Sequence, residues 1–407
     1  MRQWFRGMFR EPWFFWLLVG FIANQASVNL LRPVVSYKAL ALGVEPATLG
    51  ALSAVYALSP LLIMLRVGRL VDQKGELPFI VAGTLVMALS GFGMSVAGSP
   101  EILYFWYAVL GLGQITAVVA VQGMVARGND ESRYDARFTA FSFCASIGQG
   151  LGPAIGGFLV GSGTLGEISF AMVAGGVIAL LVLPLAALIR PPATKRQPAA
   201  GEPGGVGGSH PSLLAMLKMP GILRAILVST TVLSSIDILI IYLPALGEER
   251  AWPASLVGIL LGLRALSTMT VRIFLARLTA RYGRAPLLKG SMAIAAVSLL
   301  ALAAIDIVPV IVVIMLAAGA GLGIGQPLTM SWVASAAAPG TRAMALAVRL
   351  MGNRVGQVAL PVGAGAVAAL GGAAGVLGVT GLIVGLSLAA VYGGLTSAPA
   401  AKPARDV

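Results

Sequence analysis

The sequence has few charged residues, one cysteine and one histidine. Only 11% of its 407 residues are charged, whereas 58% are hydrophobic. With Cys144 alone, an internal disulfide is excluded, and with His210 as the single histidine no His/Cys metal cluster is expected. No Walker A lysine motif appears, so nothing indicates direct use of ATP. A nucleophile, base or metal constellation is also absent, and we therefore expect neither an enzyme nor a cofactor.

Long hydrophobic runs are what the chain does have. The mean hydropathy is +0.91, and runs of roughly 20 residues, enough to cross a bilayer, recur along the chain. The basic start MRQWFRGMFREPWFFW leads into an apolar stretch that passes any cleavage site, so we interpret it as the first span and not as a removable signal. The sequence predicts an all-α membrane protein with twelve transmembrane helices, near 12–33, 47–66, 79–98, 101–126, 138–161, 168–189, 221–244, 254–275, 287–305, 308–333, 343–370 and 375–395.

The distribution of basic residues predicts the orientation. With both termini in the cytoplasm, 21 of the 28 basic residues fall on inner loops and tails, and only Lys38 and Arg250 fall on outer loops. Most of the formal net charge of +13 then reflects topology, and we expect no nucleic-acid partner. We expect an integral protein of the bacterial inner membrane that lies in the lipid bilayer as a monomer.

Two halves of the chain repeat at an offset of 208 residues. VGRLVDQKGELPFI at 67–80 is echoed by LARLTARYGRAPLL at 275–288, and IGQGLGPAIGG at 147–157 by VGQVALPVGAG at 355–365. A Pro/Gly-rich stretch separates six spans from six, and an even number of spans gives both halves one orientation. The expected organisation is a bundle at 1–189, a cytoplasmic linker at 190–220, a second bundle at 221–398 and a tail at 399–407.

The repeated loop resembles a motif of the major facilitator superfamily of transporters, G-x-L-x-D-R/K-x-G-R/K-R/K. Its positions are occupied by Gly68, Leu70, Asp72 and Gly75, while Gln73, Glu76 and Leu77 replace the basic ones. In the second copy Arg281, Gly283 and Arg284 match, and Ala276 and Ala280 do not. The resemblance implies two pseudo-symmetric six-helix bundles and alternating access between them.

The loop residues are candidate gating residues. Gly68 and Gly75 allow a sharp turn, and the carboxylate of Asp72 suits the positive end of a neighbouring helix, worth about 0.3–2 kcal/mol. The resemblance implies that this neighbour is span eleven and that the contact favours the outward-facing state. The alternative is that Asp72 caps its own loop.

The fifth span resembles the family's antiporter motif, G-x-x-x-G-P-x-x-G-G. The matching residues are Gly148, Gly152, Pro153, Gly156 and Gly157. Small residues allow close helix packing, and the resemblance adds an exporter function. In the fourth span Tyr107 stands where the family has an arginine, so the coupling role of that arginine does not carry over.

Charged residues within spans are costly and usually functional. Asp237 is the only acid well within a span, and the repeat maps it to Asn29, just as it maps Arg264 to Tyr56. Counting ~1.5 Å per residue puts both charges deep enough to pair, so we expect an Asp237–Arg264 proton-coupling pair or, as the alternative, a structural ion pair. Arg32 lies near enough to the outer surface to snorkel.

Polar residues on span faces are expected to line the substrate path. The candidates are Asn24, Gln25, Asn29, Arg32, Tyr107, Gln326, Arg349, Asn353, Arg354 and Gln357. The predicted function is secondary active transport of a small, anionic or amphiphilic organic molecule by a proton-coupled exporter. The alternatives are a proton-coupled uptake carrier for an organic anion, because arginines within spans outnumber acids, and a sensor on the same fold that transports nothing.

Overall fold

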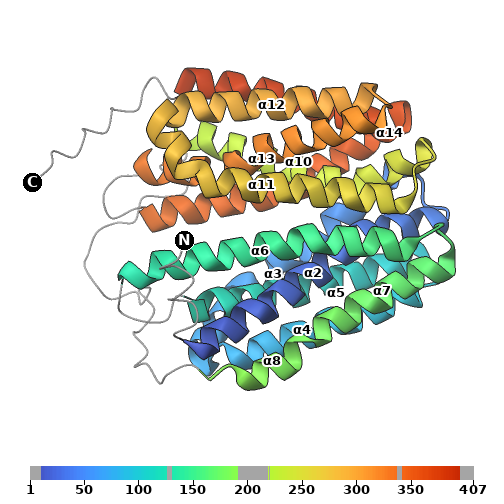
Figure 1. The fold of residues 1–407 in the computed structure, drawn as a ribbon, viewed down its shortest axis with the longest axis vertical. Coiled ribbons are helices and arrows are strands. Elements are labelled where there is room, and N and C mark those ends of the chain that lie inside the picture. The colour runs from blue at the N-terminus through green and yellow to red at the C-terminus, as the bar shows by residue number, and fades with distance from the viewer. Residues whose placement is uncertain (1–10, 126–130, 191–218, 220, 337–341, 395–407) are drawn as a thin grey trace, which may run out of the picture.

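The computed structural model describes residues 11–125, 131–190, 219, 221–336 and 342–394, apart from the side chains of a few helical residues. The described elements are helical: α2 (Pro12–Ala41), η1 (Pro46–Thr48), α3 (Leu49–Lys74), α4 (Leu77–Ser95), α5 (Pro100–Val125), α6 (Glu131–Val160), α7 (Leu165–Leu180), α8 (Val182–Leu188), α10 (Ile222–Glu249), α11 (Ala254–Tyr282), α12 (Arg284–Ala304), α13 (Val308–Ala336) and α14 (Arg342–Gly394). The helices run side by side in two groups, α2–α8 and α10–α14 (Figure 1).

The described residues contain eleven helices long and apolar enough to cross a membrane. The last of them is two spans in one, because Gly372 breaks the helical backbone of α14 with φ +61° and ψ −164°. The prediction of twelve spans in an all-α membrane protein is therefore confirmed. The predicted linker and tail lie almost wholly outside the described residues, so the domain boundaries stay a proposal.

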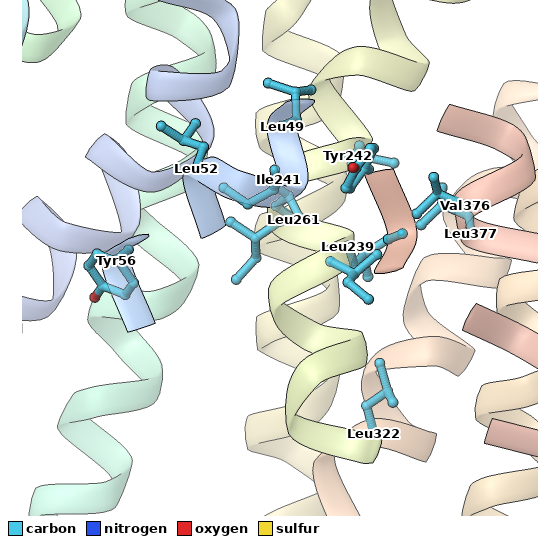
Figure 2. Packing of buried hydrophobic residues seen from close by; sticks show 14 of the residues in the cluster. Leu49, Leu52, Tyr56, Leu239, Ile241, Tyr242, Leu261, Leu322, Val376 and Leu377 are labelled. Atoms are coloured by element: carbon cyan, nitrogen blue, oxygen red, sulfur yellow. The ribbon is translucent and has the colours of Figure 1, made fainter. Parts of the chain in front are cut away.

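The hydrophobic core joins the two groups of helices. Leu49 and Leu52 of α3 lie beside Ile241 of α10 and Leu261 of α11, all of them buried in one cluster (Figure 2). In water, burial of such side chains stabilises a fold by roughly 25 cal/mol per Å² of apolar surface. Within a bilayer the lipid is itself apolar, so helix association depends more on close packing than on this effect.

Glycines make that close packing possible, as the motif in the fifth span predicted. A Cβ on Gly148 would lie 2.5 Å from the Cβ of Gln25, and one on Gly152 would lie 2.5 Å from the carbonyl oxygen of Ala26. These glycines recur every four residues along α6 and thus face α2 together. Contact at this distance requires residues without side chains.

Two related seams connect the halves. A Cβ on Gly258 of α11 would lie 2.3 Å from the carbonyl oxygen of Pro153 of α6, and one on Gly50 of α3 would lie 1.9 Å from that of Pro361 of α14. The repeat maps Gly50 to Gly258 and Pro153 to Pro361, so the two seams are copies of each other. We call them the glycine seams. Both lie toward the ends of the helices that the sequence predicts to be outside.

The predicted turns after the second and eighth spans are present, with one correction. Gly75 (φ +95°) directly follows α3 and Gly283 (φ +78°) directly follows α11, each in a backbone conformation that favours glycine. The expectation that Gly68 contributes to the first turn is wrong, because it lies within α3, which continues to Lys74. The apolar run that predicted the span ends at residue 66, but α3 continues to Lys74. A helix can extend beyond the bilayer into polar sequence, because its backbone hydrogen bonds do not depend on apolar side chains.

The expected outer-loop position of Lys38 is wrong. Helix α2 runs on to Ala41, and Lys38 is buried in its last turn, where Nζ donates to the carbonyl oxygen of Ser95 at 3.2 Å and to Oγ of Ser169 at 3.0 Å. These oxygens from α4 and α7 replace water around the ammonium group. Lys38 therefore helps hold three helices of the first half together.

Two acidic side chains cap the spans that begin at the same end. Thr164 and Glu167 form a capping box at the start of α7. At the corresponding place in the second half there is no such loop, and Oε1 of Glu249 from α10 accepts from the N–H of Ala373 at 2.7 Å, just after the break at Gly372. Either arrangement satisfies backbone donors at a helix start.

Candidate functional site

A buried ion pair connects the two halves. Nη2 of Arg32, from α2, donates to Oδ1 of Asp237, from α10, at 2.5 Å. Nε2 of Gln357, from α14, donates to Oδ2 of the same carboxylate at 2.6 Å. Both carboxylate oxygens thus have donors, as a buried carboxylate requires. Asp237 is 5% exposed.

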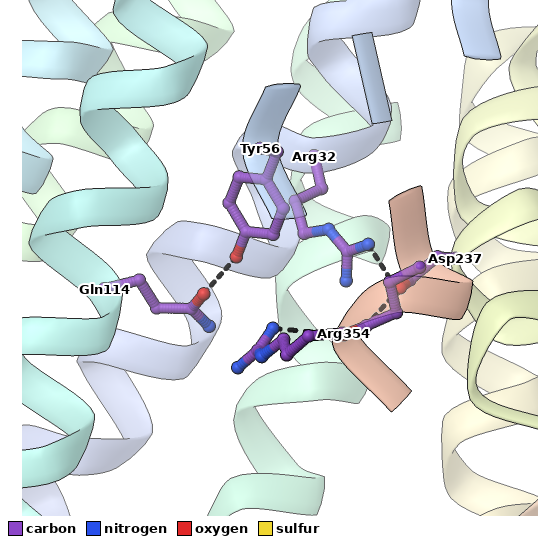
Figure 3. Close-up of polar contacts among 6 residues, drawn as sticks. Arg32, Tyr56, Gln114, Asp237 and Arg354 are labelled. Atoms are coloured by element: carbon purple, nitrogen blue, oxygen red, sulfur yellow. Dashed lines mark hydrogen bonds and ion pairs between the residues drawn. The ribbon is translucent and has the colours of Figure 1, made fainter. Parts of the chain in front are cut away.

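Aromatic and amide groups extend this site on both sides (Figure 3). The guanidinium of Arg32 lies 5.0 Å from the ring centroid of Tyr56, whose hydroxyl group bonds to Oε1 of Gln114. On the opposite side, Nη1 of Arg354 donates to Oε1 of Gln357 at 3.1 Å. We call this set the central polar network; its members are Arg32, Tyr56, Gln114, Asp237, Arg354 and Gln357.

The expected Asp237–Arg264 pair is not formed. Helix α10 packs mainly against α14, α13 and α2 and has little contact with α11, and the carboxylate bonds to α2 and α14. Counting residues from a helix end gives the depth of a side chain but not its direction around the axis, so the depth argument chose the wrong arginine. The prediction that Arg32 snorkels is wrong for the same reason, because its side chain turns inward and is only 12% exposed.

Arg264 is instead buried and has no partner in the part of the chain that the structure describes. It is 5% exposed, its Nε has no hydrogen bond, and no ion pair to it is found among the described residues. It lies within electrostatic reach of Arg32, Asp237 and Arg272. Arg272 differs, because its Nε donates to the carbonyl oxygen of Gly323 at 3.1 Å and so links α11 to α13.

Two other predicted residues form a second polar contact. Nη2 of Arg349 donates to Oε1 of Gln326 at 2.7 Å and to Oγ1 of Thr329 at 3.1 Å, which connects α14 to α13. Gln326 in turn donates to the carbonyl oxygen of Ser229 at 2.8 Å. This arginine is 4% exposed and its partners are neutral, so its charge is solvated but not compensated.

The remaining candidates do not join the central polar network through the bonds found. Asn29 donates to the carbonyl oxygen of Gln25 in its own helix at 2.8 Å, and Asn24 donates to the sulfur of Met87 at 3.1 Å. Asn353 accepts from Oγ1 of Thr230 at 3.3 Å. Of the expected stripe on span eleven, Arg354 and Gln357 face the network and Asn353 faces α10.

Tyr107, which replaces an arginine of the family pattern, lies against the network. It is fully buried and its ring stacks on that of Tyr56, with centroids 4.9 Å apart and an interplanar angle of 24°. Sequence reasoning missed Tyr56 and Gln114 as site residues. The repeat offered a signal for Tyr56, which it maps to Arg264, but it offered none for Gln114, which corresponds to Leu322.

The predicted gating residues are only partly described. Arg281 lies in the last turn of α11 with its guanidinium 5.4 Å from the ring centroid of Tyr282, and Arg284 begins α12. The backbone of Asp72 lies in α3, but its side chain is outside the described residues. The gate contact therefore stays a prediction.

Comparison with known proteins agrees with this architecture. The family model described as Major Facilitator Superfamily matches residues 17–244 and again 225–406, two overlapping matches that together cover both halves. The quinolone resistance protein NorA of Staphylococcus aureus (strain MRSA252) is 27% identical over 154 residues, 36% of this chain and 40% of that protein. The match thus spans about two fifths of the length of this relative.

Two solved structures share the fold at low identity. A bacterial homologue of the human lysosomal transporter Spinster, inward-facing and unoccupied, has a TM-score of 0.76 and 14% identity over 96% of this chain and 98% of that one. The nucleoside transporter NupG has a TM-score of 0.71 and 13% identity over 94% of this chain and 98% of that one. The chain is therefore an integral membrane transporter of the Major Facilitator Superfamily, not an enzyme, and it resembles the drug-efflux members of that family.

Proposed function

We propose that the protein exports a small organic molecule by alternating access, in exchange for protons that bind Asp237. The observation that carries this proposal is the buried ion pair between Arg32 of the first half and Asp237 of the second. Alternating access needs contacts between halves that can break. Protonation of the carboxylate removes its negative charge, and this weakens its attraction to the guanidinium.

The network suits this role because it is balanced between two effects. Burial disfavours the charged carboxylate, whereas the nearby guanidinium and the amide of Gln357 favour it. When the halves move apart, the guanidinium leaves and the first effect gains weight, so the carboxylate takes up a proton. The antiporter motif supports export, since in this chain its Gly157 and Pro153 form part of a glycine seam.

The glycine seams support an inward-facing arrangement as the one observed. They close the helix ends that we propose to be outside, with the termini in the cytoplasm of a bacterial cell. The name of NorA indicates drug resistance, and an exporter of organic molecules from the cytoplasm would fit such a role.

Inside-out membrane vesicles from a bacterial host test the direction of transport. With an acidic lumen, we expect the protein to accumulate a fluorescent quinolone or a xanthene dye in the lumen while protons leave. Asp237→Asn should abolish this accumulation but keep passive exchange, and the dependence of exchange on pH should flatten. An Asp237→Asn variant that still accumulates solute with the original pH profile contradicts the coupling role.

One observation favours a second candidate, an uptake carrier for an organic anion. The arginines assigned to span interiors are Arg32, Arg264, Arg272, Arg349 and Arg354, and they outnumber the single well-buried acid, Asp237. Right-side-out vesicles in an acidic medium distinguish the two candidates, because only a symporter then concentrates the solute inside.

A further inference from the structure

We infer that the substrate carries an anionic group, a carboxylate, sulfonate or phosphate, and that Arg264 binds it. The inference deepens the proposed transport function and rests on it, in that the bound anion is taken to be the transported molecule. It concerns the charge of the substrate, which the direction and coupling of transport leave open.

The first step is the unmatched charge of Arg264. Only 5% of this residue is exposed, its Nε has no hydrogen-bond partner, and no acid among the described residues lies within ion-pair distance of it. A buried charge without compensation is strongly unfavourable, so such residues persist where a partner arrives from elsewhere.

The second step is the position of this charge. Arg264 lies within electrostatic reach of Arg32 and Asp237, the ion pair that joins the halves. Each carboxylate oxygen of Asp237 already has a donor, Arg32 or Gln357, and no bond from Arg264 to this carboxylate is found. Around the ion pair the charges of Arg264 and Arg354 remain without an acid among the described residues. A cation would be repelled from this place, and an anion would be attracted.

The third step is the chemistry of the guanidinium group. Nε and one Nη form a fork that matches the two oxygens of a carboxylate, or two oxygens of a sulfonate or phosphate. Nε has no hydrogen-bond partner in Arg264 or in Arg349. Arg349, however, already uses Nη2 for Gln326 and Thr329, whereas no hydrogen bond of the Arg264 side chain is found among the described residues. Arg264 is therefore the arginine best prepared to bind an anionic group.

This binding would also link the substrate to the proton. An anion held by Arg264 brings negative charge close to Asp237 and so favours the protonated carboxylate. Anion and proton then assist each other's binding, which is the coupling that the second candidate function requires, uptake of an organic anion together with a proton. Exchange would require the anion and the proton to exclude each other.

Binding is tested with the purified full chain and ring-matched probes. These are 2-naphthoate, 2-naphthalenesulfonate and 2-naphthyl phosphate as anions, 2-naphthylmethylamine as the cation and 2-naphthamide as the neutral compound. Heated samples are analysed by size-exclusion chromatography for the fraction of monodisperse protein. The midpoint is the temperature at which half of the protein is no longer monodisperse. At a saturating concentration we expect at least one anion to raise this midpoint by about 2 °C or more, and the amine and amide to leave it unchanged.

Variants assign the effect to Arg264. Arg264→Gln should have a higher midpoint than the wild type without probe, because an uncompensated buried charge is removed, and should lose the shift caused by the anion. Arg264→Lys should recover only part of that shift, since it keeps the charge and loses the fork. The control is Arg250→Gln: Arg250 donates to the carbonyl oxygens of Ile305 and Ala303 away from the network, so this variant should be less stable and keep the anion shift.

The inference is overturned if no anion shifts the wild type, if the amine shifts it equally, or if the shift survives in Arg264→Gln. The transport function is judged separately in vesicles. Movement of cationic rhodamine 123 driven by a pH gradient, with no anion shift in the purified protein, would sustain transport and end the anion inference. An anion shift that requires Arg264, without movement of any probe in either direction, would support the anion inference and contradict transport.

Discussion

Asp237 places one carboxylate between three helices that belong to different halves of the molecule. It accepts from Arg32 of α2 and from Gln357 of α14, while it is itself carried by α10. Three helices meeting at one carboxylate make it the point at which a single proton acts on both halves. Replacement of either charge alone leaves the other buried and unpaired, which is more harmful than the loss of both.

We therefore predict a strong coupling between Arg32 and Asp237. Arg32→Gln or Asp237→Asn alone should each destabilise the protein, by about 3–5 kcal/mol if the remaining charge stays buried, and the double variant should regain much of the loss. Thermal unfolding of the four proteins measures this coupling. The control pair is Arg264→Gln with Asp237→Asn, for which the effects should be closer to additive because those residues do not bond.

At the scale of single residues, the sequence predicted which residue types form the polar site but not which of them contact each other. Asp237, Gln357 and Arg354 were expected at a polar site because polar groups within spans are costly. The partner of Asp237 was not predictable, since it depends on how far each helix is rotated about its axis and on which half it faces. Gln114 gave no signal because a single glutamine in an apolar span can equally bond to a backbone carbonyl.

The helices owe their arrangement to positions without side chains. In α6, three glycines of the antiporter motif face α2, and Gly157 faces α11, where its Cβ would lie 2.4 Å from the carbonyl oxygen of Ala254. The motif therefore makes two interfaces, one within the first half and one between halves. The sequence predicted close packing for these glycines, but only the structure divides them between α2 and α11.

We predict that one added methyl group in a glycine seam opens it. Gly258→Ala would place a Cβ 2.3 Å from the carbonyl oxygen of Pro153, so the helices must separate. Gly290→Ala in α12 is the matched control, because no atom lies within 4 Å of its Cβ position. Spin labels at Ser162 and Ala251, on a Cys144→Ser background, should show longer distances in Gly258→Ala only. Equal distances in both variants would mean that the seam does not hold the outer ends together.

The whole molecule consists of two copies of one six-helix bundle, which differ in the polar residues that form the candidate site. The repeat, the number of spans and the family were all predictable from the sequence. The length of a hydrophobic run and the constant offset of 208 residues are kept even where individual residues are substituted. The copies differ in their polar residues: Tyr56 stands where the second half has Arg264, and Asn29 where it has Asp237. In the second half Gly372 and Glu249 also replace the loop that separates α6 from α7.

The orientation of this molecule in the membrane remains a prediction with a direct test. Reporter fusions at residue 205 and after Val407 should both be active on the cytoplasmic side, because basic residues concentrate on the inner loops. A fusion after Ala251, between α10 and α11, serves as the control for the outer side. Activity of either of the first two fusions outside would reverse the orientation and with it the proposed direction of transport.

The glycine seams have a consequence for how the protein responds to its surroundings. Their contacts join backbone carbonyls to glycine carbons, and dissolved ions screen charges between exposed side chains but have little effect on such contacts. Closure of the outer ends should then be the same in dilute and in salty media. Bilayer thickness and lateral pressure, which act on helix packing directly, would be the physical variables that shift it.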